Sequence, residues 1–406
     1  MDQIFVLFKN LPIDLQYIVA GYAHEILCCL SQSDVEKYDW FKLIKMHFSL
    51  IYEKDSSTNE QMMRVYFDNW RFASKNIADY PNNIIQLMDG KLMGWGHNDF
   101  GLLGFGDNRR RFDFEEIKNI PKNVAAIKYN GNRSFIILED GTLMGCGHNR
   151  YGQLGLGHWR NISLFKEIKE IPKNIAEVIC SAFYTTIRLT DGTLMRCGRN
   201  DRGQLGLGDN RNRQVFTEIE KIPKNIVEVI CQDNYSIIRL TDGTLMSCGR
   251  NNHGQLGVGD DIDRNIFSEI KGIPKNIVEV ISGPINIFIR LTDGTLMTCG
   301  HNWYGQLGLG DHRNRNVLTE IKGIPKNIVD VICGWGGHSI IRLTDGTLMS
   351  CGYNYHGQLG LGDKENRKVF TEIKGIPKNI VGIKCSKNGT TITLTDGTLI
   401  KYGHDS

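Results

Sequence analysis

The feature that most constrains this sequence is a glycine-rich motif that returns at a nearly fixed interval. Gly-Gln-Leu-Gly-Leu-Gly-Asp occupies residues 305–311. It recurs, once in degraded form, in segments that begin at Gly101, Gly152, Gly203, Gly254 and Gly357. The copies up to Gly305 are 51 residues apart, and the last step is 52. A period of this length is typical of solenoids and propellers, in which each unit buries its apolar faces against its neighbours.

The motif itself predicts a tight turn. Three closely spaced glycines followed by an aspartate require backbone angles that most other residues avoid. A glycine-rich loop can also bind phosphate, but that chemistry needs a strand, a helix start and a Lys-Ser/Thr pair around it. None of these follows here, so we interpret the motif as a structural joint.

One repeat unit contains four short β-rich runs. In residues 215–251 the turn signals Pro-Lys-Asn and Asp-Gly separate these runs, and Asp242-Gly243 joins two apolar runs as in a hairpin. Each unit is therefore predicted to be a four-stranded antiparallel meander. The Asp-Gly signal occurs seven times, at Asp89, Asp140, Asp191, Asp242, Asp293, Asp345 and Asp396.

Seven such meanders predict an all-β fold, a seven-bladed β-propeller, because a ring leaves no terminal blade exposed. We expect the propeller to span residues 63–406. Its first unit is worn, and its last unit stops at Gly403-His404 without a glycine motif. Residues 1–62 form a separate segment, with helical spacing of apolar residues and a polar linker over residues 53–61.

The recurring Gly-Gln-Leu-Gly-Leu-Gly-Asp, Thr-Asp-Gly-Thr-Leu-Met and Cys-Gly-His/Arg-Asn segments closely resemble the regulator of chromosome condensation repeat. This resemblance covers roughly residues 65–406 and implies a seven-bladed propeller. Members of that family bind chromatin, exchange nucleotide on small GTPases, or serve as interaction domains. The family's Gly-x-x-His is approached only at residues 334–338, where the array is one residue longer. Units of nearly uniform length leave no room for an inserted exchange wedge.

The N-terminal segment resembles the start of an F-box, a helical module that docks onto an adaptor of ubiquitin ligases. The residues that carry this resemblance are Leu11, Pro12, Leu15 and Ile18. A Leu-Pro pair also opens ordinary amphipathic helices, so a plain packing helix is the alternative. A capping box at Ser33-Asp34-Val35-Glu36 predicts a second helix.

Composition narrows the setting. No apolar run approaches the roughly 20 residues that span a bilayer, and the N-terminus lacks the pattern of a signal peptide, so we expect an intracellular protein.

Nine of 11 cysteines occupy two positions that are fixed within the repeat, which favours reduced packing residues. Disulfides within a blade, such as Cys180 with Cys197, are the alternative. Residues 1–74 carry 7 basic and 10 acidic residues, whereas the remaining 41 basic and 35 acidic residues give a net charge of +6.

The sequence shows no catalytic constellation, metal-ligand spacing or cofactor motif. His97, His148 and His301 occupy a repeat position at which Arg199, Arg250 and Tyr353 substitute, and a general base or metal ligand would not tolerate that exchange. His338 is the most enzyme-like residue. The acidic cluster at residues 260–263 lacks the glycine and distal glutamate of a calcium loop.

The basic residues after each glycine motif carry the strongest functional signal. Because every blade presents this loop at the same place, they are predicted to lie on one face, as a binding surface for a polyanion or a partner. They are Arg109, Arg110, Arg111, Arg160, Arg211, Arg213, Arg264, Arg313, Arg315, Lys364, Arg367 and Lys368. A lysine recurs at each Pro-Lys-Asn turn, and nearby glutamates offer ion pairs, so an ordinary solvated face is the alternative.

These observations predict a non-enzymatic scaffold that self-associates or binds nucleic acid through its basic face in a salt-dependent, non-specific way. The frequent Ile, Asn and Lys residues and the uniform repeats resemble repeat proteins of giant DNA viruses, which favours a structural or genome-associated role. The alternatives are an F-box adaptor whose propeller recognises a protein, and a guanine-nucleotide exchange factor. No membrane, small-molecule substrate or cofactor is expected.

Overall fold

The computed structural model describes residues 83–86, 90–130, 132–395 and 398–404. The predicted helices and the F-box-like residues Leu11, Pro12, Leu15 and Ile18 therefore lie outside the described residues. The described chain is built from β-strands with one short 3₁₀ helix, η2 (Asp99–Gly101). Within the described ranges, no helix has the length and apolar character needed to cross a bilayer.

The strands divide between two compact units. Unit 1 comprises residues 1–149 and 160–173, and unit 2 comprises residues 150–159 and 174–406. The described part of unit 1 holds two antiparallel sheets. Their strands are β1 (Asn83–Gln86), β2 (Leu92–Gly96) and β3 (Arg111–Ile117), then β4 (Val124–Asn130), β5 (Arg133–Leu138), β6 (Leu143–Gly147) and β7 (Ile162–Glu167).

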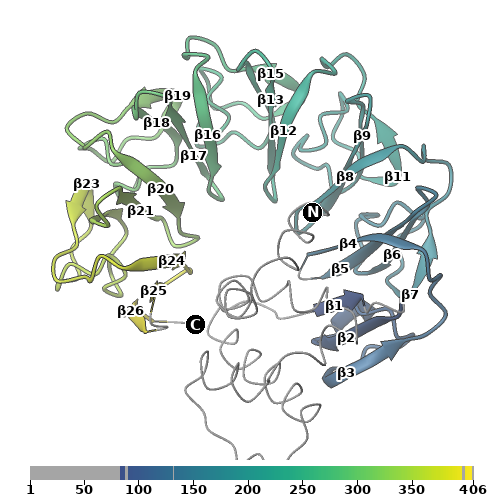
Figure 1. The fold of residues 1–406 in the computed structure, drawn as a ribbon. Coiled ribbons are helices and arrows are strands. Elements are labelled where there is room, and N and C mark those ends of the chain that lie inside the picture. The colour runs from purple at the N-terminus through teal and green to yellow at the C-terminus, as the bar shows by residue number, and fades with distance from the viewer. Residues whose placement is uncertain (1–82, 87–89, 131, 396–397, 405–406) are drawn as a thin grey trace, which may run out of the picture. The chain divides into compact units, whose positions relative to one another are not determined.

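Unit 2 holds five further sheets, which follow one another in chain order (Figure 1). Their strands are β8 (Ile175–Cys180), β9 (Tyr184–Leu189), β10 (Leu194–Gly198) and β11 (Arg213–Glu218); β12 (Ile226–Cys231), β13 (Tyr235–Leu240), β14 (Leu245–Gly249) and β15 (Arg264–Glu269); β16 (Ile277–Ser282), β17 (Asn286–Leu291), β18 (Leu296–Gly300) and β19 (Arg315–Glu320); β20 (Ile328–Cys333), β21 (His338–Leu343), β22 (Leu348–Gly352) and β23 (Arg367–Glu372); β24 (Ile380–Cys385), β25 (Gly389–Leu394) and β26 (Leu399–Gly403).

The all-β prediction and the count of seven meanders are confirmed. Five sheets have the expected four strands, while the first and seventh have three among the described residues. The Asp-Gly hairpin is also confirmed, since Asp242-Gly243 connects β13 to β14. There the Asp242 carboxylate accepts hydrogen bonds of 2.9 Å from both the backbone N–H and the hydroxyl of Thr244, which fixes the turn.

The second and third strands of each four-stranded sheet form the core. In β13, residues Tyr235 to Ile238 are all buried, because neighbouring sheets cover both faces of the strand. Such a strand has a continuous apolar run rather than an alternating pattern. One cluster joins Ile237 and Leu245 of the fourth sheet to Ile277 and Ile289 of the fifth. Burial of apolar surface between sheets is therefore the main source of stability within unit 2.

Within unit 2 the tight turn of the glycine motif also bonds to the following sheet. The Gly308 amide donates to Gly305 and the Gly310 amide to Lys368, the latter lying on β23 of the following sheet, at 3.0 and 2.8 Å. At Gly308 φ is +71°, and a Cβ there would lie 2.6 Å from the Phe370 ring. Because the amides of both glycines already have protein acceptors, the loop is not built to cradle phosphate.

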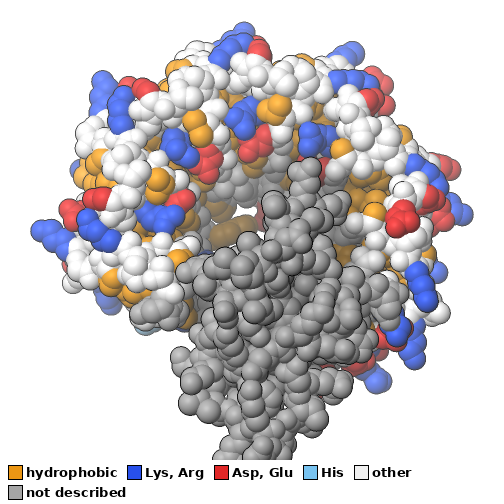
Figure 2. All heavy atoms as spheres, viewed as in Figure 1, with side chains coloured by type: hydrophobic (Ala, Val, Ile, Leu, Met, Phe, Trp, Pro, Cys, Tyr) orange, Lys and Arg blue, Asp and Glu red, His pale blue; other side chains and the backbone are white. Residues whose placement is uncertain are grey.

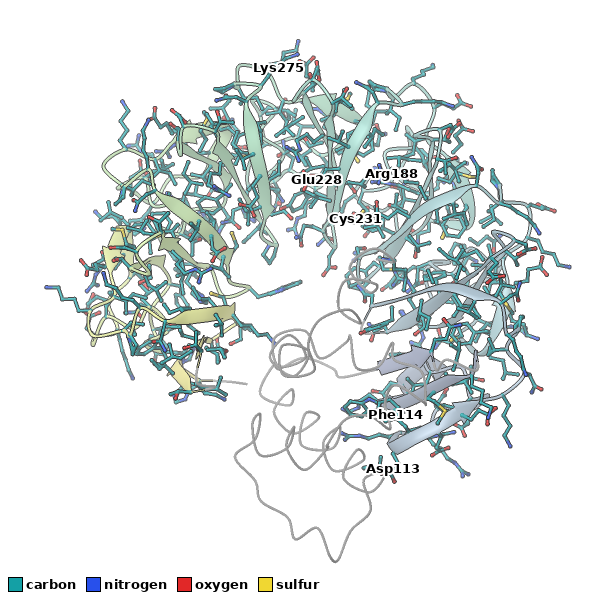
Figure 3. The ribbon with its side chains drawn as sticks, in the orientation of Figure 1. Asp113, Phe114, Arg188, Glu228, Cys231 and Lys275 are labelled. Carbon is teal, nitrogen blue, oxygen red and sulfur yellow. The ribbon has the colours of Figure 1, made fainter. Side chains whose placement is uncertain are left out.

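Polar contacts also cross the sheet boundaries. The Arg188 guanidinium of β9 donates to the carbonyl of Ile226 on β12 at 3.1 Å and pairs with Glu177 at 3.0 Å. Figure 3 shows Arg188 and Cys231 near this boundary. The Cys248 thiol contacts the Gln204 carbonyl of the preceding sheet at 3.6 Å. Cysteine and arginine side chains thus both make hydrogen bonds to backbone carbonyls of an adjacent sheet.

The nine cysteines among the described residues are all free. In the sheet register Thr185 pairs with both Cys180 and Cys197, so it separates them. The disulfide alternative for that pair is therefore wrong. These thiols are packing residues, and burial raises the pKa of Cys248 to about 12, which makes it unreactive as a nucleophile.

Candidate interaction face

Two sets of loops lie at the same end of each sheet. One is the turn between the first and second strands, and the other is the long loop between the third and fourth strands, which contains the glycine motif. We call this end the glycine-loop face; in unit 2 its loops comprise residues 181–183, 232–234, 283–285, 334–337 and 386–388, and residues 199–212, 250–263, 301–314 and 353–366. The opposite end carries the Asp-Gly and Pro-Lys-Asn turns.

Five of the predicted binding arginines form ion pairs within their own loops. Each pairs with the aspartate that ends the glycine motif four residues earlier, and each side chain is at most 26% exposed. The pairs are Arg111–Asp107, Arg213–Asp209, Arg264–Asp260, Arg315–Asp311 and Arg367–Asp363. The paired guanidinium is the main cause that lowers the pKa of the first four aspartates, whereas the pKa of Asp363 is lowered first by the backbone N–H of Glu365 and then by the guanidinium. These five arginines brace the loop, so a ligand would have to compete with an internal carboxylate for them.

The other predicted binding residues differ from these five arginines in their exposure and in their contacts. Among the described residues Arg211, Arg313, Lys364 and Lys368 are exposed and take part in no ion pair. In unit 1, Arg109 and Arg110 are exposed, and the Arg110 guanidinium lies 5.4 Å above the Phe112 ring. Arg160 is exposed on the segment that leads into β7, and its backbone carbonyl accepts a hydrogen bond of 3.1 Å from the Asn149 side chain. In Figure 2, basic and acidic side chains stand next to one another over much of the visible surface.

The recurring lysines of the Pro-Lys-Asn turns bind aspartates, not the glutamates considered from the sequence. Each pairs with the Asp-Gly aspartate of the preceding sheet: Lys173–Asp140, Lys224–Asp191, Lys275–Asp242, Lys326–Asp293 and Lys378–Asp345, at 2.6 to 3.3 Å. The Lys275 ammonium group is the main cause that lowers the pKa of Asp242 to about 2. These pairs are exposed and salt-screened, so each contributes little to stability.

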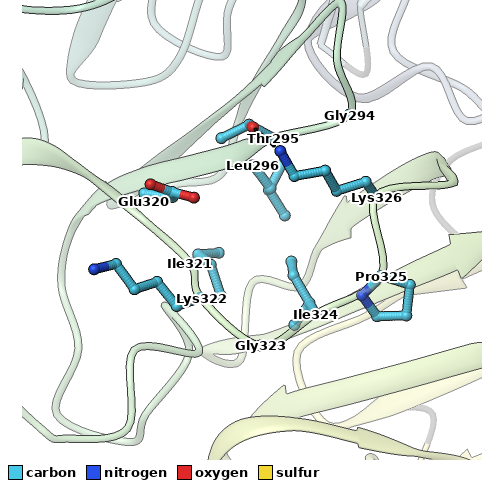
Figure 4. A pocket seen from close by; sticks show the side chains of 10 residues that line it. All are labelled: Gly294, Thr295, Leu296, Glu320, Ile321, Lys322, Gly323, Ile324, Pro325 and Lys326. Atoms are coloured by element: carbon cyan, nitrogen blue, oxygen red, sulfur yellow. Dashed lines mark hydrogen bonds between the residues drawn. The ribbon is translucent and has the colours of Figure 1, made fainter.

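A pocket lies beside one of these turns, and the lysine at its rim is paired with an aspartate in the same way. It is lined by residues 294–296 and 320–326 (Figure 4). The Lys326 ammonium group at its rim donates to Asp293 at 3.2 Å and to Thr295 at 3.1 Å. Because this arrangement repeats in neighbouring sheets, the pocket is part of the repeat and not a specialised site.

Two histidines of the described residues are buried and make hydrogen bonds with neutral side chains. His338 is 1% exposed, its Nε2 lies 3.1 Å from the Thr390 hydroxyl, and burial lowers its pKa to about 4. His301 is also buried, with a pKa lowered to about 4 by burial, and its Nδ1 lies 2.6 Å from the Gln306 amide. Both imidazoles are neutral at pH 7. Among the described residues, no group of three His, Cys, Asp or Glu side chains is placed to hold a metal ion.

The structure brings together an aromatic surface that the sequence reading missed. On the glycine-loop face of unit 2, eight rings form a continuous chain with centroid separations of 4.6 to 6.5 Å. They are His253, His301, Trp303, Tyr304, Tyr353, Tyr355, His356 and His404, and we call them the aromatic belt. Six of them come from the three variable positions around the fixed asparagine in Cys-Gly-x-Asn-x-x-Gly at residues 299–305 and 351–357. That clustering of rings at variable positions was the available sequence signal.

The one-residue lengthening of the array lies beside this belt. It belongs to the turn at residues 334–337, where Trp335 is 62% exposed. A Cβ on Gly337 would lie 3.2 Å from the Tyr304 ring, so the turn packs directly against the belt. The irregular position therefore adds an exposed indole to the same surface.

Comparisons with known proteins agree with this architecture. Residues 191–238, 293–341 and 345–392 match the regulator of chromosome condensation (RCC1) repeat, and a second description of that repeat matches residues 124–153 and 328–358. The ultraviolet-B receptor UVR8 of Arabidopsis thaliana is 28% identical over 68% of this chain and 64% of the receptor. Human HERC4, a probable E3 ubiquitin-protein ligase, is 27% identical over 70% of this chain and 32% of the ligase.

Solved structures share the fold. Prp20p from Saccharomyces cerevisiae, studied with its binding properties to Gsp1p and histones, aligns with a TM-score of 0.58, 19% identity and coverage of 80% of this chain and 81% of Prp20p. Human WBSCR16 aligns with a TM-score of 0.58, 18% identity and coverage of 78% and 85%. The chain spans less than two thirds of UVR8 and about a third of HERC4. With its repeat motifs, its seven meander sheets and these matches, the chain contains regulator of chromosome condensation repeats, and its fold class is the seven-bladed β-propeller.

Proposed function

We propose that this protein is a non-enzymatic scaffold whose glycine-loop face binds an anionic polymer, with nucleic acid as the first candidate. The observation that carries the proposal is the contrast between two sets of arginines in the same loops. Arg213 and Arg315 are neutralised by aspartates, whereas Arg211 and Arg313, two residues before them, are exposed without an ion pair among the described residues. The loops therefore present one cation without an ion pair from each of two sheets, the third and the fifth, whereas the fourth sheet between them has Ile262 at this position.

The strength of such binding is limited by the small number of free charges. Among the predicted binding residues of unit 2, Arg211, Arg313, Lys364 and Lys368 supply four, and each phosphate neutralised contributes a slope of about −0.9 in log K against log salt. We expect a total slope of about −3 to −4 and weak affinity for one copy. Useful binding then requires several copies along one polymer, because linked sites gain effective concentration. Self-association is for this reason part of the proposal.

The test is a titration of the purified full chain into labelled nucleic acid at several salt concentrations near 50–200 mM. The variant Arg211→Ala/Arg313→Ala/Lys364→Ala/Lys368→Ala should bind less and show a flatter salt dependence. The matched control replaces four lysines of the opposite end, Lys224, Lys275, Lys326 and Lys378, by alanine, which removes the same charge. Absence of binding at 50 mM salt, or equal losses in both variants, would contradict a specific basic face.

A protein partner is the second candidate, and the exposed aromatic residues favour it. Trp303 and Trp335 are each 62% exposed, and exposed Trp and Tyr are common anchors of protein interfaces. Yeast Prp20p, with the same fold, has been studied for binding to Gsp1p and histones, and the HERC relatives are probable ubiquitin ligases. Nucleotide release from a small GTPase at catalytic amounts of this protein would favour exchange. Association with a ubiquitin-ligase adaptor that is lost on Leu11→Ala/Ile18→Ala would favour the F-box adaptor.

A further inference from the structure

The aromatic belt has the composition of a stacking surface. Three rings on or beside it present most of their area to solvent: Trp303 and Trp335 at 62% and Tyr355 at 66% exposed. Isolated exposed aromatics are common, but contiguous ones mark binding sites. Here the ring centroids of Tyr304 and of Tyr353 in the next sheet are 4.7 Å apart, so the belt continues across the boundary between the fifth and sixth sheets. It ends at His404 of the seventh sheet, 5.8 Å from His356.

The loops that carry these rings are held in place before any ligand arrives. The Asn302 side chain accepts the Leu307 amide at 2.9 Å and donates to the Asp311 carbonyl at 3.0 Å. Asn354 makes the same two bonds with Leu359 and Asp363, at 2.9 and 3.0 Å. Trp303 and Tyr355 each follow one of these asparagines. A ligand that stacks on them therefore orders little of the protein.

The charges around the belt favour an anionic ligand. Its histidines include His301, which is neutral at pH 7, and His253, whose pKa burial lowers. Arg313 adjoins Asn314, whose amide lies 3.5 Å from the His253 ring. Lys387 lies beside the Trp335 turn, because a Cβ on Gly336 would collide with its carbonyl oxygen. With Lys364, these are three unpaired cations among the described residues of that region. Two acids without an ion pair there, Asp261 and Glu365, offset them only in part.

On this basis, and resting on the proposed function, we propose that the preferred ligand is single-stranded nucleic acid, whose bases stack on Trp303, Trp335 and Tyr355 while Arg313, Lys364 and Lys387 contact its phosphates. Proteins that bind single strands combine aromatic platforms with a basic track in this way. A duplex cannot use the rings, because its bases are already stacked on one another. The arginine loops alone would not make this distinction.

A cationic peptide is the competing ligand for exposed rings. In the third sheet Arg199 already lies 5.6 Å from the Tyr151 ring and 5.2 Å from Phe183, so the same loop can hold a guanidinium group. The uncompensated cations around the belt oppose a cationic ligand there. An acidic peptide would satisfy these charges but would use the rings less fully than unstacked bases. Both peptides serve as competitors in the test.

The experiment measures binding of the full chain to a labelled 20-nucleotide mixed-sequence single strand and to the matching duplex, at several salt concentrations. We expect the single strand to bind at least about tenfold more tightly. Trp303→Ala and Tyr355→Ala should each weaken single-strand binding about 5- to 100-fold with the salt slope unchanged, since stacking involves no counterion release. Arg313→Ala should flatten the slope instead. Tryptophan fluorescence should fall on binding, and less so in Trp303→Phe.

The outcomes separate the two proposals. Equal binding of duplex and single strand, with Trp303→Ala harmless and Arg313→Ala harmful, would overturn the stacking inference and leave the basic scaffold standing. No binding of either nucleic acid at 50 mM salt would overturn both. Displacement of the bound single strand by a poly-lysine or poly-glutamate peptide that itself quenches Trp303 would likewise overturn the inference. Val317→Ala, a change at an exposed apolar residue of β19 outside the belt, is the matched control and should leave binding unchanged.

Discussion

The Arg196 guanidinium donates a hydrogen bond of 2.9 Å to the hydroxyl of Ser236, across the boundary between the third and fourth sheets. Arg196 is 0% exposed, and it has no carboxylate partner among the described residues: it also donates to the Gln204 carbonyl at 3.0 Å, and its guanidinium lies 5.0 Å from the Phe267 ring. Other repeats place Ser247, Thr298 or Ser350 here. A buried cation has thus replaced a small hydroxyl at a sheet boundary.

The first prediction concerns this arginine. Replacing a buried, carbonyl-bound charge by an apolar side chain of similar volume is often neutral or stabilising, because the cost of desolvating the charge disappears. We therefore expect Arg196→Met to stay within about 1 kcal/mol of the wild type, whereas Arg196→Ala leaves a cavity and costs about 2–4 kcal/mol. Urea denaturation of both variants measures the difference. If Arg196→Met is destabilised as much as Arg196→Ala, the hydrogen bonds, and not the volume, hold this boundary.

The second prediction concerns the glycine motif. Gly308 and Gly323 both have positive φ, +71° and +76°, but a Cβ on Gly308 would meet the Phe370 ring at 2.6 Å, whereas a Cβ on Gly323 would meet no non-neighbouring atom within 4 Å. Gly323→Ala should cost only the left-handed strain of about 1–2 kcal/mol. Gly308→Ala adds overpacking and should cost about 2–5 kcal/mol. Thermal unfolding of the two variants checks the order, and equal losses would mean that the close approach is relieved by movement of Phe370.

The repeat made the strand plan predictable, because the Asp-Gly turns and glycine motifs mark both ends of each hairpin. Which charged residues form ion pairs was harder to predict from the sequence. The pairing of Arg315 with Asp311 follows from their four-residue spacing in a loop, but that spacing supports a pair only once the turn geometry is known. The aromatic belt could not be read directly, since Tyr304 and Tyr353 are 49 residues apart and meet only because successive sheets pack side by side. A scan of the variable repeat positions would have raised it as a candidate.

The third prediction concerns pH. Burial lowers the pKa of His338 to about 4, against about 6.5 in an unfolded chain. Between these values the unfolded state binds a proton that the folded state does not, so stability is full above pH 6.5 and falls as the pH drops towards 4. The shift corresponds to about 3 kcal/mol. His338→Asn, which copies Asn286 at the equivalent position, should reduce the loss of stability between pH 7 and 4.5.

The control for this measurement is His312→Asn, because His312 is exposed. Urea midpoints at pH 7, 5.5 and 4.5 should decline in parallel for the wild type and this control. A residual decline is expected in His338→Asn, since His301 has a pKa lowered to about 4 as well. Identical pH profiles for the wild type and His338→Asn would mean that His338 is protonated in the folded protein.

The last prediction separates the two roles of arginine within one loop. Arg315 pairs with Asp311 at 2.6 Å and donates to the Arg313 carbonyl at 2.7 Å, so it fixes the backbone that carries Arg313. Arg315→Ala should lower the melting temperature by an amount equivalent to about 1 kcal/mol, because it leaves the partly buried Asp311 without its main partner. Arg313→Ala should leave the melting temperature unchanged but reduce the salt slope of nucleic-acid binding by about 0.9, the contribution of one phosphate. Loss of slope in Arg315→Ala alone, with Arg313→Ala unchanged, would reverse the assignment and show that the paired arginine exchanges its aspartate for a phosphate.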